Sequence, residues 1–294
     1  MNEDRIEIYI EKHGDKIRKV LVEKFDFSNR LMNKLEEEGN IYLNDKKASL
    51  DKNTYIDDVL RVDFRDEDNI YKENKMNLKI LYEDEDILGI NKPPFMLVHP
   101  SKDDRSDTLA NGVVWYFKEK GLKRKIRFIN RLDMNTSGVV LIAKNSFGHS
   151  RLMKEMNNNI VVKKYLAFVE GTFNKKEDTI DLPIGLLEGE NIKRAVIKSG
   201  DYSISKYRVV EEYNNITLVE IEIETGRTHQ IRVHMSHIGH PVIGDELYGR
   251  KSKLINRQAL HCSEMNFKGT RRKEIITVKA PIPEDFKKIM EESR

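Results

Sequence analysis

The order of apolar and polar residues divides the chain into two parts. Residues 16–35 carry apolar side chains at the spacing of an amphipathic helix, with lysines and arginines between them. A Phe-Asp-Phe-Ser segment interrupts this spacing, so two short helices are predicted, the second capped by Ser28 and ended at Gly39. A hairpin that turns at residues 44–45 and a strand at residues 59–62 are predicted to follow.

From residue 78 onward the pattern is dominated by strands. Residues 139–143 and 161–171 are rich in β-branched and aromatic side chains, which favour strands. Residues 203–212 and 216–224 alternate apolar and polar positions, as neighbouring antiparallel strands do. The sheet is therefore expected to be mixed but mainly antiparallel.

Helical segments are interspersed among these strands. They are predicted at residues 108–118 and at residues 145–157, where Asn145 is a suitable N-cap. Residues 67–77 are polar, charged and without periodicity, which is typical of a linker. The chain is thus predicted to be an α+β protein: a small α/β domain over residues 1–66, a linker, and a sheet domain with flanking helices over residues 78–294.

Composition narrows the class of protein. The 294 residues include 52 lysines and arginines against 49 acidic residues, so a nucleic-acid-binding surface would depend on where the charges lie. A single cysteine, Cys262, excludes an internal disulfide framework and cysteine-rich zinc sites. No segment approaches about 18 consecutive apolar residues, and the charged start has no signal-peptide core. A cytoplasmic protein without membrane contact is therefore expected.

Residues 130–144 combine turn-forming and strand-forming residues as functional loops often do. Arg131, Leu132 and Asp133 are followed by turn formers and then by the apolar strand. Catalytic groups often sit on loops that rigid elements hold in place. In an extended chain Arg131 and Asp133 point to one face. Local sequence alone favours the interpretation that Asp133 only hydrogen-bonds its own turn.

The sequence Arg-Leu-Asp-x-x-Thr-Ser-Gly at 131–138 resembles the catalytic motif of the RluA-like family of pseudouridine synthases. Four further phrases of that family follow in the same order. They are Lys-x-Tyr-x-Ala at 163–167, Gly-Arg-Thr-His-Gln-Ile-Arg-x-His at 226–234, Gly-His-Pro-Val-Ile-Gly-Asp at 239–245 and Arg-Gln-Ala-Leu-His at 257–261. The resemblance implies an isomerase that converts specific uridines in structured RNA, ribosomal or transfer, to pseudouridine without a cofactor.

The resemblance also implies roles for individual residues. Asp133 would be the catalytic carboxylate, and Arg227 its salt-bridge partner, since burial alone would raise the pKa of a carboxyl in a closed pocket. A carboxylate can attack ribose carbon 1 or uracil carbon 6, or remove a sugar proton, and the sequence does not choose among these routes. Tyr165 would lie beside the target base, stacking on it or transferring a proton. Arg131 would fill the space that the base vacates.

The first domain resembles the small α-L RNA-binding domain of many pseudouridine synthases, through Glu-Gly-x-Ile-x-Leu-Asn at 38–44. Two places depart from that pattern, at residues 28–30 and at residues 57–58, where Ser-Arg and Gly-Asp are usual. A flexibly tethered domain that adds RNA affinity is expected. The basic side chains that could face phosphates, or form only a solvated helix face, are Lys16, Arg18, Lys19, Arg30 and Lys34.

Four histidines between positions 229 and 240 raise the alternative of a metal site. They are His229, His234, His237 and His240. No carboxylate or cysteine completes a recognisable ligand set, and the spacing matches no zinc signature. Hydrogen-bonding residues around a turn are the preferred interpretation, so no metal is predicted. RNA is the expected partner, and the protein is expected to act as a monomer.

Two other functions compete with this interpretation. A non-catalytic RNA-binding or ribosome-associated factor could keep the fold, but it would have no chemical reason to keep Asp133, Tyr165 and Arg227. A glycosidase or nucleoside hydrolase would use paired carboxylates, whereas the motif offers one Asp and no obvious second acid.

The chain departs from the family's catalytic motif at one position. Asn130 stands where many members have His, and this change affects how the strand end is hydrogen-bonded.

Overall fold

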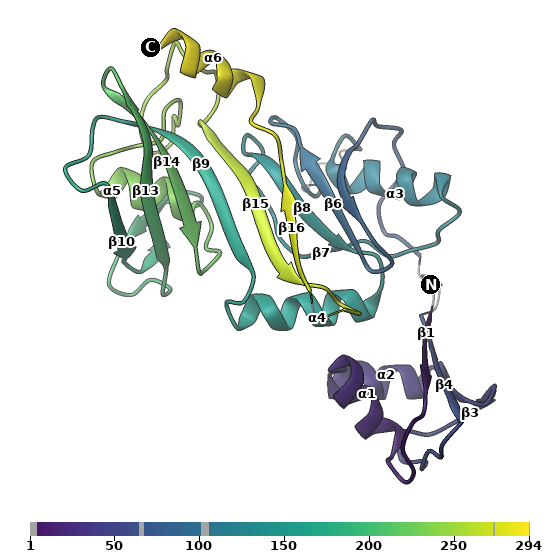
Figure 1. Ribbon diagram of the computed structural model, residues 1–294. Coiled ribbons are helices and arrows are strands. Elements are labelled where there is room, and N and C mark those ends of the chain that lie inside the picture. The colour runs from purple at the N-terminus through teal and green to yellow at the C-terminus, as the bar shows by residue number, and fades with distance from the viewer. Residues whose placement is uncertain (1–4, 65–67, 101–105, 273, 294) are drawn as a thin grey trace.

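The computed structural model describes residues 5–64, 68–100, 106–272 and 274–293, which form two units built on separate sheets (Figure 1). The elements of the N-terminal unit are β1 (Arg5–Tyr9), α1 (Ile17–Phe25), α2 (Asn29–Glu37), β2 (Ile41–Leu43), β3 (Lys46–Lys47) and β4 (Val59–Asp63). Its sheet has the order β1-β4-β2-β3, and all neighbours are antiparallel. The two helices, the hairpin and the last strand were predicted, whereas β1 was not.

Local hydrogen bonds explain the break between α1 and α2. The hydroxyl of Ser28 accepts a hydrogen bond from the Leu31 N–H at 3.3 Å, which confirms the predicted N-cap. Asp26, directly after α1, has a left-handed φ of 55°, which turns the chain out of the first helix. In β1, Ile6 and Ile8 point into the same core as the two helices. Ile6, Ile8 and Ile10 alternate with polar residues, which is a strand pattern that the prediction did not use.

The second unit has one large sheet with helices on its faces. Its strands are β5 (Lys79–Glu83), β6 (Ile87–Lys92), β7 (Arg127–Phe128), β8 (Ser137–Ala143), β9 (Val162–Glu170), β10 (Glu177–Asp181), β13 (Ile204–Tyr213), β14 (Ile216–Ile223), β15 (Leu260–Lys268) and β16 (Ile275–Lys279). Its helices are α3 (Leu109–Glu119), α4 (Ser146–Asn157), α5 (Gln230–His237) and α6 (Glu284–Glu292), and β11 (Ile184–Leu186) pairs with β12 (Arg194–Val196) beside the sheet.

The strand order confirms the predicted fold class. The large sheet runs β10-β13-β14-β9-β15-β8-β6-β5, with β16 beside β15 and β7 beside β8. Among the described strand pairs, β15 and β8 are parallel and the others are antiparallel. The chain is therefore an α+β protein with a mixed, mainly antiparallel sheet. Among the described residues, no helix is long and apolar enough to cross a bilayer.

Strand β8 fixes the position of the turn that precedes it. All of its residues are buried, as expected for a strand covered on both faces. Gly138 has a φ of 114°, and a Cβ added to it would lie 2.1 Å from the carbonyl oxygen of Cys262 on β15. Only glycine allows β8 and β15 to approach so closely. The start of β8, and the turn before it, are thus held at the middle of the sheet.

The segment predicted as a linker lies against the second unit. Residues 68–77 contain no helix or strand, but Asn74 N–H donates to the Asn111 carbonyl of α3 at 3.1 Å. The Asn111 amide in turn donates to the Lys72 carbonyl at 2.7 Å, and Asn69 accepts from the Ile126 N–H at 2.8 Å. This segment is therefore bonded along α3. The predicted boundary between residues 66 and 67 lies outside the described residues.

The N-terminal unit packs against α4, which lies at the edge of the large sheet that faces this unit (Figure 1). Phe147 of α4 is fully buried in the N-terminal core, and its ring stacks on Phe27 at 4.9 Å between centroids and on Phe64 at 5.9 Å. Lys154 of α4 binds the Asp26 carboxylate at 2.7 Å. The expectation of a flexible tether is therefore wrong for this structure, because the two units share an apolar cluster.

Candidate active site

Asp133 lies in the turn between β7 and β8, at the centre of the large sheet. Its carbonyl accepts from the Thr136 N–H at 3.1 Å, so its backbone closes the turn, while its partly exposed side chain lines a pocket. Asn130 holds the start of this turn on β8, because its side chain donates to the Val139 carbonyl at 3.1 Å and accepts from the Leu141 N–H at 2.8 Å. The side chain of Asn130 thus makes hydrogen bonds to β8 of the kind that the backbone of a neighbouring strand makes.

A buried lysine that sequence reasoning missed holds the other side of the turn. Lys92, at the end of β6, donates its three ammonium protons to the carbonyls of Pro93, Met96 and Met134 at 2.9–3.0 Å. Met134 directly follows Asp133. Burial, together with the nearby charge of Arg257, lowers the pKa of Lys92 to about 7, against the opposing charge of Asp133. In the sequence it stands between an apolar strand and two prolines, in an Asn-Lys-Pro phrase that resembles the start of the family's catalytic domain but assigns it no role.

The Asp133 carboxylate is paired with Arg232 of α5. Arg232 Nη1 donates to Asp133 Oδ2 at 3.0 Å, while its Nε and Nη2 bind the two oxygens of buried Asp245 at 2.6 and 2.8 Å. Burial lowers the pKa of the Arg232 guanidinium, but the hydrogen bonds and charges of Asp245 and Asp133 outweigh it and raise that pKa overall. Arg232 is therefore a fixed cation that spans two carboxylates and orients one of them.

The prediction that Arg227 pairs with Asp133 is wrong. Arg227 lies in the turn before α5, where its Nε donates to the Tyr202 carbonyl at 3.1 Å, although the residue still lines the same pocket. The motif at residues 226–234 contains two arginines, and α5 begins between them, at Gln230. Arg232 therefore falls on the buried face of the helix, whereas Arg227 stays exposed. The signal available in the sequence was an arginine between Ile231 and Val233, which needs carboxylate partners when buried.

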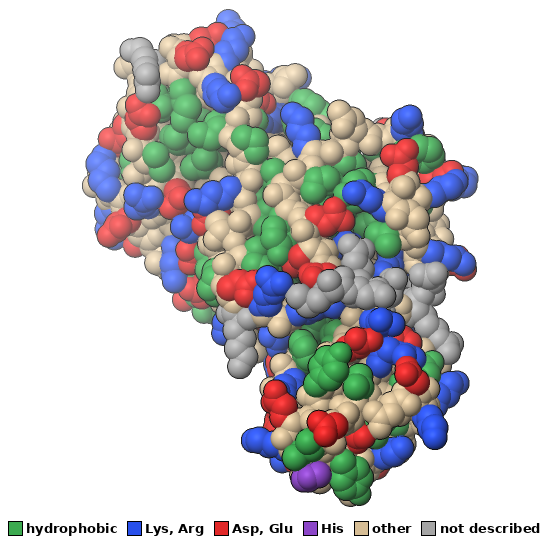
Figure 2. All heavy atoms as spheres, turned by 45° about the vertical axis from the view of Figure 1, so that its right-hand side comes forward, with side chains coloured by type: hydrophobic (Ala, Val, Ile, Leu, Met, Phe, Trp, Pro, Cys, Tyr) green, Lys and Arg blue, Asp and Glu red, His purple; other side chains and the backbone are tan. Residues whose placement is uncertain are grey.

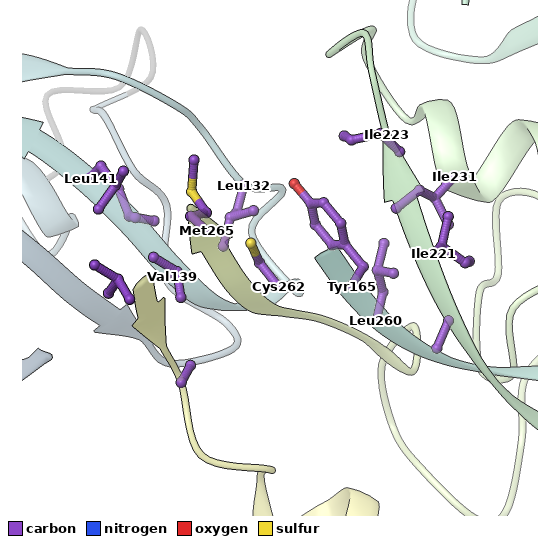
Figure 3. Packing of buried hydrophobic residues seen from close by; sticks show 14 of the residues in the cluster. Leu132, Val139, Leu141, Tyr165, Ile221, Ile223, Ile231, Leu260, Cys262 and Met265 are labelled. Atoms are coloured by element: carbon purple, nitrogen blue, oxygen red, sulfur yellow. The ribbon is translucent and has the colours of Figure 1, made fainter. Parts of the chain in front are cut away.

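Tyr165 of β9 forms an apolar wall of the pocket. Its ring stands between Leu132 and Cys262 on one side and Ile223 on the other (Figure 3). Burial, with Cys262 and Asp133 adding to it, raises the pKa of the phenol well above its usual 10. The hydroxyl therefore stays protonated at neutral pH. A flat, uncharged ring beside a carboxylate is suited to hold a planar base.

The pocket joins these groups into one site. It is a cavity of about 70 Å³ that opens to solvent. Its lining residues are Arg131, Leu132, Asp133, Thr136, Tyr165, Ile223, Arg227, His229, Gln230, Ile231, Arg232 and Leu260. Arg131, Asp133, Tyr165 and Arg227 were all predicted site residues, and the fold brings them together from three separate segments. Arg131 and Arg227 are exposed, so both present a cation near the opening.

Comparison with known proteins identifies the family. The model of the RNA pseudouridylate synthase family matches residues 86–237, a span that contains Asp133, Tyr165 and Arg232. The chain belongs to this family. The resemblance to pseudouridine synthases is thereby confirmed, and these enzymes are isomerases.

Individual relatives agree with this assignment. The synthase is 40% identical over 213 residues to the RNA pseudouridine synthase YjbO of Bacillus subtilis, covering 72% of this chain and 75% of the relative. It is 29% identical over 305 residues to ribosomal large subunit pseudouridine synthase D of Pasteurella multocida, covering 97% and 93%. The solved structure of human RNA pseudouridylate synthase domain containing 1 matches with a TM-score of 0.59 and 28% identity, covering 70% of this chain and 83% of that one.

The basic side chains predicted to bind RNA from the N-terminal unit of the synthase mostly have acidic or polar neighbours. Lys16 pairs with Asp51 at 3.3 Å, Lys19 with Asp15 at 2.6 Å and Lys34 with Glu38 at 3.6 Å. Arg18 donates to Asn33 at 3.2 Å, and Arg30 is exposed. On the face seen in Figure 2, basic and acidic side chains alternate across the surface. Such exposed pairs are weak, so they leave these cations available to phosphates.

The four clustered histidines of the synthase have different surroundings, and His237 is exposed at the end of α5. His234 is buried between the Ser205 hydroxyl and the Leu182 carbonyl, at 2.9 Å from each. His240 stacks on Phe173 with ring centroids 3.8 Å apart. His229 faces the pocket. In the part of the chain that the structure describes, no group of three or more potential ligands is arranged to hold a metal ion.

Proposed function

We propose that this synthase converts specific uridines of large-subunit ribosomal RNA to pseudouridine, with Asp133 as the catalytic carboxylate. The role of Asp133 is supported by its ion pair with Arg232 in a pocket walled by Tyr165. The ribosomal target is supported by the similarity to a ribosomal large subunit pseudouridine synthase, which extends over 97% of this chain. Transfer RNA is the alternative target.

The reaction balances within the nucleotide and the pocket. The bond between ribose carbon 1 and uracil nitrogen 1 breaks, the uracil turns, and carbon 5 is joined to ribose carbon 1. Carbon 5 then loses its proton, and nitrogen 1 gains one, so the product has the mass of the substrate. Asp133 starts this sequence either as a nucleophile or as the base that removes a sugar proton. Arg232 orients the carboxylate through its hydrogen bond in both cases.

The other pocket residues hold the substrate in this proposal. Tyr165 stacks on the uracil and stays protonated, because burial raises the pKa of its hydroxyl. The uridine must leave the RNA helix, and unstacking and unpairing its base costs a few kcal/mol of free energy. Arg131 enters the space that the base vacates, and Arg227 contacts phosphate at the rim, since both are exposed at the pocket. The basic side chains of the N-terminal unit add salt-dependent affinity.

Mapping of pseudouridine tests this proposal. Carbodiimide labelling and primer extension are applied to ribosomal and transfer RNA from cells with the intact gene, without it, and with Asp133→Asn. At least one ribosomal position is expected to lose its label in the last two strains. With purified protein, Asp133→Asn is expected to slow the reaction at least about 100-fold, because the amide is neither a nucleophile nor a base.

Asp51→Asn is the matched control, since Asp51 is exposed and far from the pocket in the N-terminal unit. It should modify RNA normally. A lost label in transfer RNA alone would replace the ribosomal target. Unchanged RNA in all strains would favour a non-catalytic RNA-binding factor, and release of free uracil, seen by mass spectrometry, would favour a hydrolase.

A further inference from the structure

His229 is held in an unusual conformation at the edge of the pocket. It precedes α5 with a φ of 59° and a ψ of 17°, a left-handed conformation that is uncommon for residues other than glycine, although histidine adopts it more often than most. Strain of this kind persists where the surrounding structure holds it in place, often at functional sites. The side chain of His229 is 12% exposed, and its Nε2 lies 3.7 Å from Asp133 Oδ2.

Hydrogen bonds around Tyr248 define which nitrogen of His229 carries the proton. The Tyr248 hydroxyl oxygen accepts from the Arg194 N–H of β12 at 2.9 Å and lies 2.9 Å from His229 Nδ1. Because a phenol oxygen accepts chiefly one strong hydrogen bond, we assign the hydroxyl proton to the contact with Nδ1. A neutral imidazole that accepts at Nδ1 carries its hydrogen at Nε2. The Nε2–H therefore points into the pocket, on the side of Asp133.

The imidazole is kept neutral by its surroundings. Burial lowers the pKa of His229, and the charges of Arg232 and Arg194 act in the same direction, against those of Asp133 and Asp245. The 3.7 Å gap to Asp133 is too long for a hydrogen bond. This Nε2–H is thus a preformed donor that faces the pocket without being bound to the carboxylate.

Tyr248 also supports the cation of the site. The Arg232 guanidinium lies over the Tyr248 ring, 5.0 Å from its centroid. Asp245, which binds Arg232 bidentately, accepts from the Tyr248 N–H at 3.3 Å. Tyr248 therefore positions both His229 and Arg232, the two residues that lie beside Asp133 on this side of the pocket.

We infer that His229, fixed by Tyr248 as its Nε2–H tautomer, is a catalytic hydrogen-bond donor to a carbonyl oxygen of the target uracil. When the glycosidic bond breaks, its electron pair stays on the ring and is shared with the carbonyl oxygens. A donor already in place stabilises that charge. Tyr248 is a positioning residue. This inference rests on the proposed function, because it needs uracil beside Asp133 and Tyr165.

Two substitutions of His229 separate the donor from the backbone. In His229→Asn the new side chain tolerates the left-handed conformation and can reach the Tyr248 hydroxyl. Its amide group, however, ends near the position that Nδ1 has in the wild-type protein. His229→Gln fits the backbone less well, but its amide can place a donor near the position of Nε2. If the donor matters, the Gln variant is the more active of the two. If only the backbone matters, the Asn variant is.

The experiment measures single-turnover pseudouridine formation and binding on a ribosomal RNA fragment that contains the mapped uridine. We expect His229→Asn to lower the rate at saturating enzyme about 100-fold, as the loss of one oxyanion donor does elsewhere. The RNA Kd should not change. His229→Gln should recover much of the rate, and Tyr248→Phe, which keeps the ring under Arg232, should cause a smaller loss than His229→Asn.

Each outcome decides the question. A wild-type rate in His229→Asn, or equal losses in the Asn and Gln variants with unchanged thermal unfolding, would overturn the role of His229 as a donor. An inactive wild-type protein on every RNA would instead refute the proposed function, so the two failures are distinguishable.

Discussion

Arg232 is the residue on which the arrangement of the site depends most directly. It lies between Asp133 and Asp245 with only 8% of its side chain exposed. A buried carboxylate without its cation is costly, since water cannot solvate it. The same guanidinium therefore stabilises the fold through Asp245 and prepares the chemistry through Asp133.

Replacing this arginine is expected to affect both properties. Arg232→Gln should lower the free energy of unfolding by about 3–5 kcal/mol, because buried Asp245 loses its partner. It should also abolish pseudouridine formation. Arg227→Gln is the control within the same motif, and chemical denaturation should find its stability close to that of wild type, as for most exposed positions. Equal destabilisation by the two variants would contradict the assignment of the ion pair to Arg232.

Among the elements, the parallel pair of β8 and β15 carries the site. Ser137, the first residue of β8, lies opposite His261 of β15, and the Ser137 hydroxyl is 2.9 Å from His261 Nδ1. Burial, helped by the charge of Arg257, lowers the pKa of His261 to about 4. The neutral imidazole is therefore part of the contact that fixes the strand following Asp133.

This contact predicts a specific sensitivity to acid. The unfolded chain protonates its histidines near pH 6.5, whereas folded His261 does so near pH 4, so the unfolded state binds more protons between these values. Stability from His261 should thus be complete above about pH 6.5 and fall by up to about 3 kcal/mol as the pH drops to about 4. Urea unfolding from pH 7 to pH 4 would show this slope in wild type.

The matched variant is His261→Gln, which keeps a polar side chain but does not titrate. Its stability should be lower at pH 7, and the difference from wild type should shrink on acidification. A constant difference over the whole range would mean that His261 does not titrate as its burial requires.

At the scale of the whole molecule, the N-terminal unit is docked rather than loosely attached. Phe147 joins its core, Lys154 and Arg151 bind Asp26, and the Arg271 guanidinium donates to the Arg5 carbonyl at 3.0 Å. Apolar burial supplies the attraction, and the ion pairs set the orientation. RNA bound to the N-terminal unit would therefore meet the catalytic pocket at a fixed distance and angle.

Loss of the buried ring should release the N-terminal unit. Phe147→Ala removes the shared aromatic contact, at a cost of about 3–5 kcal/mol. Small-angle scattering should then show a larger radius of gyration, and RNA affinity should fall more than turnover at saturating RNA. Tyr116→Phe, a change at a partly exposed ring on α3, is the control. Wild-type scattering from Phe147→Ala would mean that the unit is held in another way.

Removing residues 1–66 is a separate test of the same unit. The shortened protein should bind RNA more weakly while keeping most of its turnover at saturating RNA, because the pocket residues all lie outside this segment. Equal affinity and equal turnover would count against a role of the N-terminal unit in binding.

The sequence by itself determined the elements and most of the chemistry. Helix periods, the Ser28 cap and strand alternation depend on neighbours within a few residues, so the pattern contains them. The ordered motifs identified the family and pointed to Asp133 and Tyr165. Strand β1 was missed although Ile6 and Ile8 alternate with polar residues, and nothing in the local sequence shows that the charge of Lys92 is buried.

Only the tertiary structure decided which distant groups meet. Arg232 and Asp133 are 99 residues apart, and the apolar neighbours of Arg232 point to its burial without showing which carboxylates it meets. Phe147 lies in α4 of the second unit, and the sequence pattern does not show that it packs in the core of the N-terminal unit. In both cases the outcome depends on which side chains share a volume without water. That property belongs to the packed chain and has no short-range pattern in the sequence.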